Sequence, residues 1–332
     1  MIQHIKNKVY IIKIALSLYA ISMIGYVNAQ SMPQIQGKLV YHTYESYDAW
    51  DSKIYLFDFE TKKLSCINDF IEGTYHTMNA SFNLDGTKIV FMGITNQQGV
   101  EEWNIFIYKL ASNELEQLTY NLRNEDPKFS PDGSKVVYKQ GEWSSDLDKM
   151  IYSLCEIDLQ TKEIKKITND IVEKSMPYYS SDGESVYYME GTGTQSRICS
   201  IKLDGSFEVT EIFSEENAQV YYPIIYHDNL YFTKFYSKDN LNDIIVKMDI
   251  NSGEITVPIF NSEFSNSSDA CPLSDELLVI SSTKPGGRGG YDLYIVNQTT
   301  GESWSLTEFN EDINNEYEQL GASCYIQSIN KL

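Results

Sequence analysis

Short runs of alternating apolar and polar residues recur along the chain from Gly37 onward, and turns separate them. The clearest run is Lys135 to Lys139, which follows the Ser-Pro-Asp-Gly turn that ends at Gly133. Alternation with a period of two predicts a β-strand, and such a turn between two runs indicates a hairpin. No ten-residue stretch after residue 29 shows a convincing 3.6-residue period. The pattern therefore predicts a chain of strands in which helices are nearly absent.

The turn and its flanking runs return at nearly constant spacing. Clear copies begin at Asn79 (NASFNLDGTKIVFMG), Asp126 (DPKFSPDGSKVVYKQ) and Met176 (MPYYSSDGESVYYME), and weaker ones begin at Tyr222 and Cys271. With the proline or its substitute as the mark, the copies fall at Ala80, Pro127, Pro177, Pro223, Pro272 and Ala322. The intervals are 47, 50, 46, 49 and 50 residues. A fixed period of about 20 to 50 residues indicates stacked or radial repeats.

Each period contains four runs of strand length, which is the content of one β-propeller blade. Six marks predict six blades of four antiparallel strands. The segment Gly37 to Tyr44 matches the second strand of a blade, and Gly321 to Ile329 supplies a first strand without a second. We therefore expect the two ends to share one blade and close the ring, which removes free sheet edges. A seven-bladed ring is the alternative.

Two local motifs resemble known repeats. The phrase P-x-F-S-P-D-G at residues 127–133, with Leu118-Thr119 before it and Ile167-Thr168 closing the next blade, resembles the TolB-like, WD-like β-propeller repeat. The stretches SSTKPGGRGGYDLYIV (residues 281–296) and INNEYEQLG (residues 313–321) resemble propeller repeats in envelope proteins of Bacteroidetes-type bacteria. The resemblance spans Gly37 to Ile329 and implies a propeller that works in the cell envelope.

The first 29 residues predict a cleaved signal peptide. Lys6, Lys8 and Lys13 precede an apolar run from Ile14 to Val27, and a cut after Ala29 fits the small residues there. The run is short for a membrane span, which needs about 20 residues, although an uncleaved anchor is the alternative. We expect residues 30–332 to form a single propeller, periplasmic or secreted, monomeric and without a membrane span.

The remaining chain is strongly acidic. It carries 23 Lys and Arg against 47 Asp and Glu, a net charge of −24. Nucleic-acid binding requires clustered cations, so this function is excluded. Its five cysteines form no C-x-x-C motif, and we expect most of them to be small buried residues.

Catalytic signatures are absent from the sequence: it has no G-x-S-x-G elbow, phosphate loop or H-E-x-x-H motif. His76 is the best single candidate for chemistry at the mouth of the ring. Glycoside hydrolysis would require a pair of carboxylates, and the sequence leaves the choice open among Glu125, Asp126, Asp269, Glu316 and Glu318. We predict no catalytic residue, metal ligand or cofactor.

The loops between blades, and those between the second and third strands within each blade, should gather at one face of the ring. Aromatic, charged and amide side chains in these loops suit a glycan or a protein partner. The residues predicted to contribute to this binding face are Trp50, His76, Arg123, Glu125, Asp126, Trp143, Lys174, Tyr222, Asp269, Arg288 and Glu316.

The favoured interpretation is an exported, non-enzymatic binding or scaffold module for an envelope protein or glycan. One alternative is a carbohydrate-active propeller enzyme, a polysaccharide lyase or hydrolase that uses His76 with a carboxylate. Another is an architectural protein that contacts peptidoglycan-associated partners.

Overall fold

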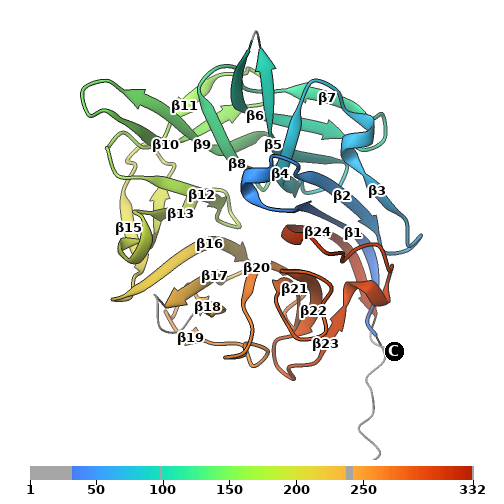
Figure 1. Cartoon of the computed structure of the whole chain (residues 1–332). Helices are drawn as coiled ribbons and strands as arrows, with labels where there is room; N and C mark the ends of the chain where they lie inside the picture. The colour runs from blue at the N-terminus through green and yellow to red at the C-terminus, as the bar shows by residue number, and fades with distance from the viewer. Residues whose placement is uncertain (1–31, 98, 237–241, 331–332) are drawn as a thin grey trace, which may run out of the picture. The chain divides into compact units, whose positions relative to one another are not determined.

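A computed structural model describes residues 32–97, 99–236 and 242–330, so the predicted signal peptide and its cut lie outside the described residues. Residues Ile35–Ser328 form one compact unit. In this unit six four-stranded sheets are arranged as blades around a central axis (Figure 1). The predicted fold, an all-β propeller of six antiparallel four-stranded blades, is confirmed.

We number the blades from the one that contains the first strand. In each blade the strands are given from the innermost to the outermost. Blade 1 is β24 (Glu318–Asn330), β1 (Gln34–Tyr44), β2 (Lys53–Asp58) and β3 (Leu64–Cys66); blade 2 is β4 (Tyr75–Phe82), β5 (Lys88–Gln97), β6 (Val100–Lys109) and β7 (Glu114–Gln117); blade 3 is β8 (Arg123–Phe129), β9 (Lys135–Ser144), β10 (Lys149–Asp158) and β11 (Ile164–Lys166). Blade 4 is β12 (Lys174–Tyr179), β13 (Ser185–Glu190), β14 (Arg197–Lys202) and β15 (Val209–Phe213); blade 5 is β16 (Ala218–Tyr226), β17 (Asn229–Tyr236), β18 (Asp243–Asp249) and β19 (Ile255–Thr256); blade 6 is β20 (Ser267–Pro272), β21 (Leu277–Ser282), β22 (Asp292–Asn297) and β23 (Ser303–Ser305).

Helical structure in the described residues is limited to four short 3-10 turns. They are η1 (Tyr47–Ala49), η2 (Ile67–Phe70), η3 (Gly193–Gln195) and η4 (Leu306–Glu308). In the described part of the chain, no helix has the length and hydropathy to cross a membrane.

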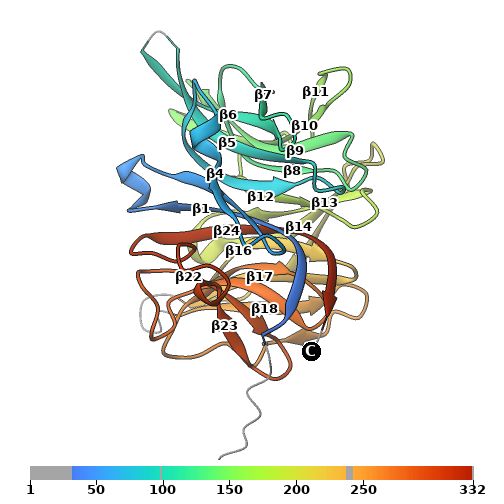
Figure 2. The ribbon, with the colours of Figure 1, turned by 90° about the vertical axis from the view of Figure 1, so that its right-hand side faces the viewer.

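The ends of the chain meet in blade 1, where β24 is the innermost strand and β1 lies beside it (Figure 2). Gly37 lies where β1 passes β24, and a Cβ atom at this position would come within 2.2 Å of the Tyr325 carbonyl oxygen. The Tyr41 hydroxyl donates to the Ile313 carbonyl at 3.1 Å, across 272 residues of sequence. The predicted ring closure by shared strands is therefore present.

The apolar core lies between neighbouring blades. Val136 and Tyr138 of β9 pack in a cluster with blade 2, whereas Val137 between them packs with blade 4. The second strand of blade 3 is thus buried on both faces. The alternation expected for Lys135 to Lys139 is therefore wrong, because Val136, Val137 and Tyr138 are apolar at successive positions and all buried.

Every innermost strand contains one residue with a left-handed backbone at the same position. These residues are Asn79 (φ 55°), Asp126 (55°), Met176 (53°), Tyr222 (53°), Asp269 (54°) and Gly321 (65°). In blades 2 to 6 the pairing of the first two strands shifts register at this point, as at a β-bulge. We call these six residues the bulge ring.

The bulge ring corrects one of the sequence marks. The residue after Asp269 is Ala270, so the position equivalent to Pro127 in blade 6 is Ala270 and not Pro272. The true intervals are 47, 50, 46, 47 and 52 residues. In blade 6 the proline lies three residues after the left-handed Asp269, whereas in blade 3 it follows the left-handed Asp126 directly.

Candidate functional site

Two hollows in the described part of the propeller contain seven of the eleven predicted site residues. The first is the central channel, a cavity of about 500 Å³ bounded by the innermost strands of all six blades. It extends from the bulge ring to the turns that join the first two strands of the blades, near Leu84, Pro131, Ser181 and Leu273. We call the side with these turns the turn face, and the opposite side, where blade-to-blade loops gather, the loop face.

Three predicted residues, Asp126, Tyr222 and Asp269, belong to the bulge ring and line the channel. Asp126 accepts from Asn79 Nδ2 at 2.8 Å and from the Met176 backbone N–H at 3.3 Å. Asp269 accepts from the Gly321 N–H at 3.0 Å. The two carboxylates therefore link neighbouring blades around the channel, a role that can coexist with ligand binding.

Burial dominates the electrostatics of the channel. It raises the pKa of Asp269 to about 6, against hydrogen bonds from Gly321 and Ser268 that favour the charged carboxylate. Burial also lowers the pKa of Lys128, an effect opposed by Asp126 and Asp269. Burial and the nearby Asp269 and Asp126 hold the pKa of Tyr222 well above its usual value. The channel thus combines one cation, two carboxylates and phenols in a poorly solvated space.

Lys128 and Tyr178 are channel residues that the sequence analysis missed. Each lies two positions after a member of the bulge ring on the innermost strand of its blade, where it lines the channel. The repeat would have indicated them if the left-handed residue, and not the proline, had been taken as the mark.

The second hollow is a cavity of about 520 Å³ at the loop face of blades 1 to 3. It contains four of the predicted residues: Trp50, His76, Arg123 and Trp143. Trp50 follows η1 and is 46% exposed. Trp143 lies near the end of β9 and is 59% exposed. Tyr47, Trp103, Asp48, Glu101 and Glu102 complete much of the wall.

His76 is the centre of the aromatic part of this cavity. Its ring stacks on Trp50 with centroids 6.0 Å apart and lies 5.3 Å from the Trp103 ring. The imidazole Nδ1 accepts from the Ser52 backbone N–H at 3.2 Å. Burial lowers the pKa of His76 despite the nearby Asp51, so the ring is neutral at neutral pH. The ring thus packs against the indoles of both Trp50 and Trp103.

Arg123 and Glu125 form one polar group at the cavity. The Arg123 side chain donates to the buried Glu125 carboxylate, which also pairs with Lys139 at 3.2 Å. Lys139 lies 4.0 Å from the centre of the Tyr152 ring. Arg123 is therefore oriented before any ligand arrives.

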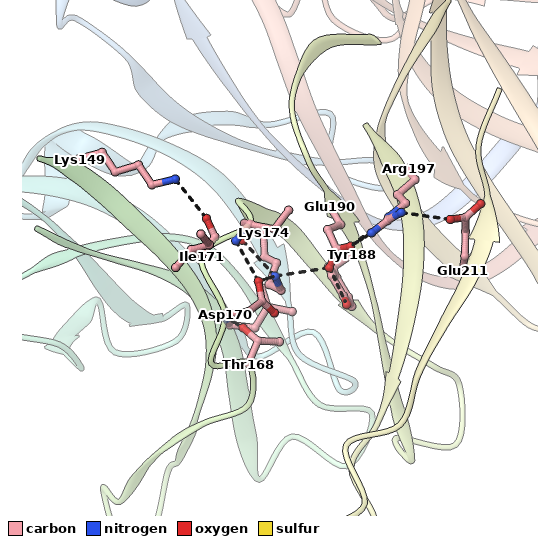
Figure 3. Close-up of polar contacts among 11 residues, drawn as sticks. Lys149, Thr168, Asp170, Ile171, Lys174, Tyr188, Glu190, Arg197 and Glu211 are labelled. Atoms are coloured by element: carbon pink, nitrogen blue, oxygen red, sulfur yellow. Dashed lines mark hydrogen bonds and ion pairs between the residues drawn. The ribbon is translucent and has the colours of Figure 1, made fainter. Parts of the chain in front are cut away.

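The other predicted residues lie apart from both hollows. Lys174 is buried. Figure 3 shows its ammonium group between Asp170, with which it forms an ion pair, and Glu190, whose carboxylate is 3.4 Å away. Arg288 donates to the Glu311 carbonyl at 2.8 Å, and its own N–H donates to Asp292. Glu316 is an exposed loop residue. The structure does not bring these three together with the cavity residues.

The described residues contain no group of three or more His, Cys, Asp or Glu side chains placed to hold a metal ion. Three of the five cysteines, Cys155, Cys199 and Cys271, are buried, as expected for most of them.

No family model matches the chain. Over 154 residues it is 30% identical to the Tol-Pal system protein TolB of Wolinella succinogenes, a match that covers 46% of this chain and 34% of the relative. TolB from Acinetobacter baumannii superposes with a TM-score of 0.63 at 16% identity, over 88% of this chain and 67% of that chain. This chain carries a TolB-like β-propeller.

Its relation to TolB is distant, at 30% identity over 154 residues, and the chain spans about a third of the length of the matched curated relative. The TolB-like propeller is also similar in structure to a protein that is not a TolB. Kuenenia stuttgartiensis hydrazine synthase superposes with a TM-score of 0.65 at 12% identity, over 88% of this chain and 47% of that chain. At such identity the likeness concerns the fold alone.

Proposed function

We propose that this protein is an exported, non-enzymatic recognition module of the cell envelope that binds a glycan in the aromatic cavity of its loop face. Export is supported by the charge and apolar pattern of residues 1–29 and by the relation to TolB. The resemblance to Bacteroidetes-type envelope propellers supports the same location. The observation that carries the binding proposal is the pair of exposed tryptophans, Trp50 and Trp143, that line one concave cavity.

The chemistry of the cavity suits a sugar. Indole faces stack on the apolar faces of sugar rings, while carboxylates and a fixed guanidinium can bond to hydroxyl groups. Asp48, Glu101 and Glu102 supply acceptors, and Arg123 supplies donors held in place by Glu125. Because the net charge is −21 for the whole chain, a neutral or amino-bearing glycan is favoured over an anionic one.

A protein partner is the second candidate function, and the relation to a Tol-Pal system protein favours it. Exposed tryptophan and arginine are the usual anchors of protein interfaces. An enzymatic role has less support, since His76 is enclosed by aromatic rings and its Nδ1 already accepts a hydrogen bond from the Ser52 backbone N–H.

The test is a screen of the purified protein against neutral, amino and acidic bacterial glycans, with released products assayed in parallel. We expect binding without products, and a loss of at least about tenfold in affinity in Trp143→Ala or Trp50→Ala. The matched control is Phe264→Ala, which removes an aromatic side chain that is 80% exposed and lines neither hollow.

Released products would overturn the non-enzymatic proposal. If Trp50→Ala, Trp143→Ala and Phe264→Ala all retain binding, the glycan site lies outside the aromatic cavity. If no glycan binds, a photo-crosslinking residue at position 143, with position 264 as control, tests the protein-partner candidate in intact envelopes.

A further inference from the structure

The innermost strands meet their neighbours in a fixed register. The side chain two residues after the bulge ring faces the next blade, and the one three residues after it faces the preceding blade. In blade 1, for example, Ser323 Oγ accepts from the Phe82 backbone N–H of blade 2 at 3.3 Å. The Tyr179 hydroxyl of blade 4 reaches back to Glu156 of blade 3 at 2.9 Å. Every blade boundary therefore brings together one residue of each kind.

At five boundaries the two residues of this pair are of different types. The pairs are Ser81 with Phe129, Lys128 with Tyr179, Tyr178 with Ile225, Ile224 with Pro272, and Ser323 with Phe82. At the boundary between blades 6 and 1 the same rule pairs Cys271, two residues after Asp269, with Cys324, three residues after Gly321. The repeat thus predicts a contact between two thiols.

The contacts around this boundary agree with the register. The Gly321 N–H donates to the Asp269 carboxylate at 3.0 Å and aligns β24 with β20. Cys271 is, after burial, the neighbour that raises the pKa of the Cys324 thiol, and both residues line the central channel. Cys66, Cys155 and Cys199 lie in blades 1, 3 and 4, outside the residues that line the channel.

We propose that Cys271 and Cys324 form a disulfide that covalently joins blade 6 to β24 and locks the closed ring. The location in an oxidising compartment rests on the proposed export. The oxidant is a disulfide compound. One cysteine thiolate attacks it to give a mixed disulfide and releases one thiol, and the second thiolate then displaces the other thiol to form the cross-link.

The cross-link would lie at the boundary where the ring closes, so it would prevent the ring from opening there. Blade 1 is the blade assembled from both ends of the chain, and β24 is its innermost strand. Ring opening between blades 6 and 1 would carry β24 away from β20. A bond between positions 271 and 324 prevents this separation and restricts the unfolded chain.

The thiols are more reactive before the ring closes. Burial raises the pKa of Cys324 in the folded protein, which disfavours the attacking thiolate. Oxidation should therefore accompany folding, and the bond should resist reduction once the channel has formed.

The test is to refold the reduced protein in a buffer of reduced and oxidised glutathione and, separately, in excess reductant. Alkylation and mass spectrometry then count the free thiols, and peptide mapping identifies the linked pair. We expect three alkylated cysteines after oxidation against five after reduction, a Cys271–Cys324 peptide, and a melting midpoint higher by about 5 °C in the oxidised protein.

Cys271→Ser and Cys324→Ser should each abolish the difference between the two buffers, whereas the half-buried control Cys66→Ser should retain it. If a serine variant fails to fold, Cys→Ala at the same position replaces it. Five free thiols after oxidative refolding, or a different linked pair, would overturn the proposal. Five free thiols in protein alkylated inside the cell, with the cross-link forming in vitro, would instead count against the proposed export.

Discussion

Asn79 donates a hydrogen bond from its side-chain amide to the carboxylate of Asp126, at 2.8 Å, across the boundary between blades 2 and 3. The two residues occupy the same position in successive blades, 47 residues apart, and both have a left-handed backbone. The other oxygen of Asp126 accepts from the Met176 N–H of blade 4 at 3.3 Å. One carboxylate therefore joins three blades beside the channel.

Replacing Asp126 tests whether this link stabilises the ring. Asp126→Ala leaves the Met176 N–H and the Asn79 amide without their acceptor, and we expect a loss of about 1–3 kcal/mol in the free energy of unfolding. Asp126→Asn should lose less, because asparagine tolerates a left-handed backbone and keeps one acceptor oxygen. Urea unfolding of both variants measures the difference. Equal stability of the alanine variant and the wild type would contradict a structural role for the link.

Asp269 should give the protein a stability component that falls as pH rises. Burial raises the pKa of this carboxyl from 3.8 to about 6 in the folded state, so folding favours its protonated form. The stabilisation is complete below about pH 4 and is lost as pH rises through about 6, an effect of up to about 3 kcal/mol.

The matched variant is Asp269→Asn, which keeps an acceptor for the Gly321 N–H. We expect it to gain stability relative to the wild type between about pH 4.5 and about pH 7, as measured by urea unfolding. A constant difference between the two proteins across this range would contradict the raised pKa.

The fold was predictable because its signals are local. A Pro-Asp-Gly turn with short apolar runs around it, as at residues 127–139, indicates one hairpin, and repetition of the hairpin indicates the ring. The mistaken mark at Pro272 shows the limit of this reasoning. The equivalent position is set by the left-handed backbone at Asp269, and a bulge of this kind has no fixed residue type among Asn, Asp, Met, Tyr and Gly.

The candidate site was predictable in part. Loop topology was sufficient to gather Trp50, His76, Arg123 and Trp143 at one cavity. Asp126, Tyr222 and Asp269 lie in the channel instead, since the bulges turn their side chains toward it. The partners of Lys174 could not be chosen from a sequence with 47 acidic residues, because the pairing depends on which strands lie side by side.

A variant at Lys174 tests whether this buried residue stabilises the fold or contributes to ligand binding. Its ammonium pairs with Asp170 and Glu190, and Glu190 also pairs with Arg197. Lys174→Met removes one partner of a buried pair, for which we expect a loss of about 3–5 kcal/mol in stability. Lys162→Met breaks an exposed pair with Glu116 and should cost less than about 1 kcal/mol.

Thermal and urea unfolding compare the two variants, and glycan binding is measured under conditions where each is folded. Unchanged binding in a folded Lys174→Met variant would assign this residue to the structure of blade 4. A loss of binding without a loss of stability would return it to the binding face.

His42 should oppose Asp269 in the pH dependence of stability. Its ring is buried against Gly321, and its Nδ1 accepts from the Asn79 N–H at 3.4 Å. Burial, with smaller effects of His76 and Lys128, lowers the pKa of His42 from 6.5 to about 3. The unfolded chain therefore binds a proton that the folded protein excludes, and stability is lost as pH falls from about 6.5 toward about 3.

The variant His42→Gln removes this titration while keeping an acceptor for Asn79. Between about pH 7 and about pH 4.5 we expect the wild type to lose about 2–3 kcal/mol more stability than the variant. Since Asp269 acts in the opposite direction over the same range, the wild-type curve is the difference of the two effects. The double variant His42→Gln with Asp269→Asn should therefore show a slope of stability against pH near that of the wild type. A slope equal to that of either single variant would show that one of the two groups does not titrate as its burial requires.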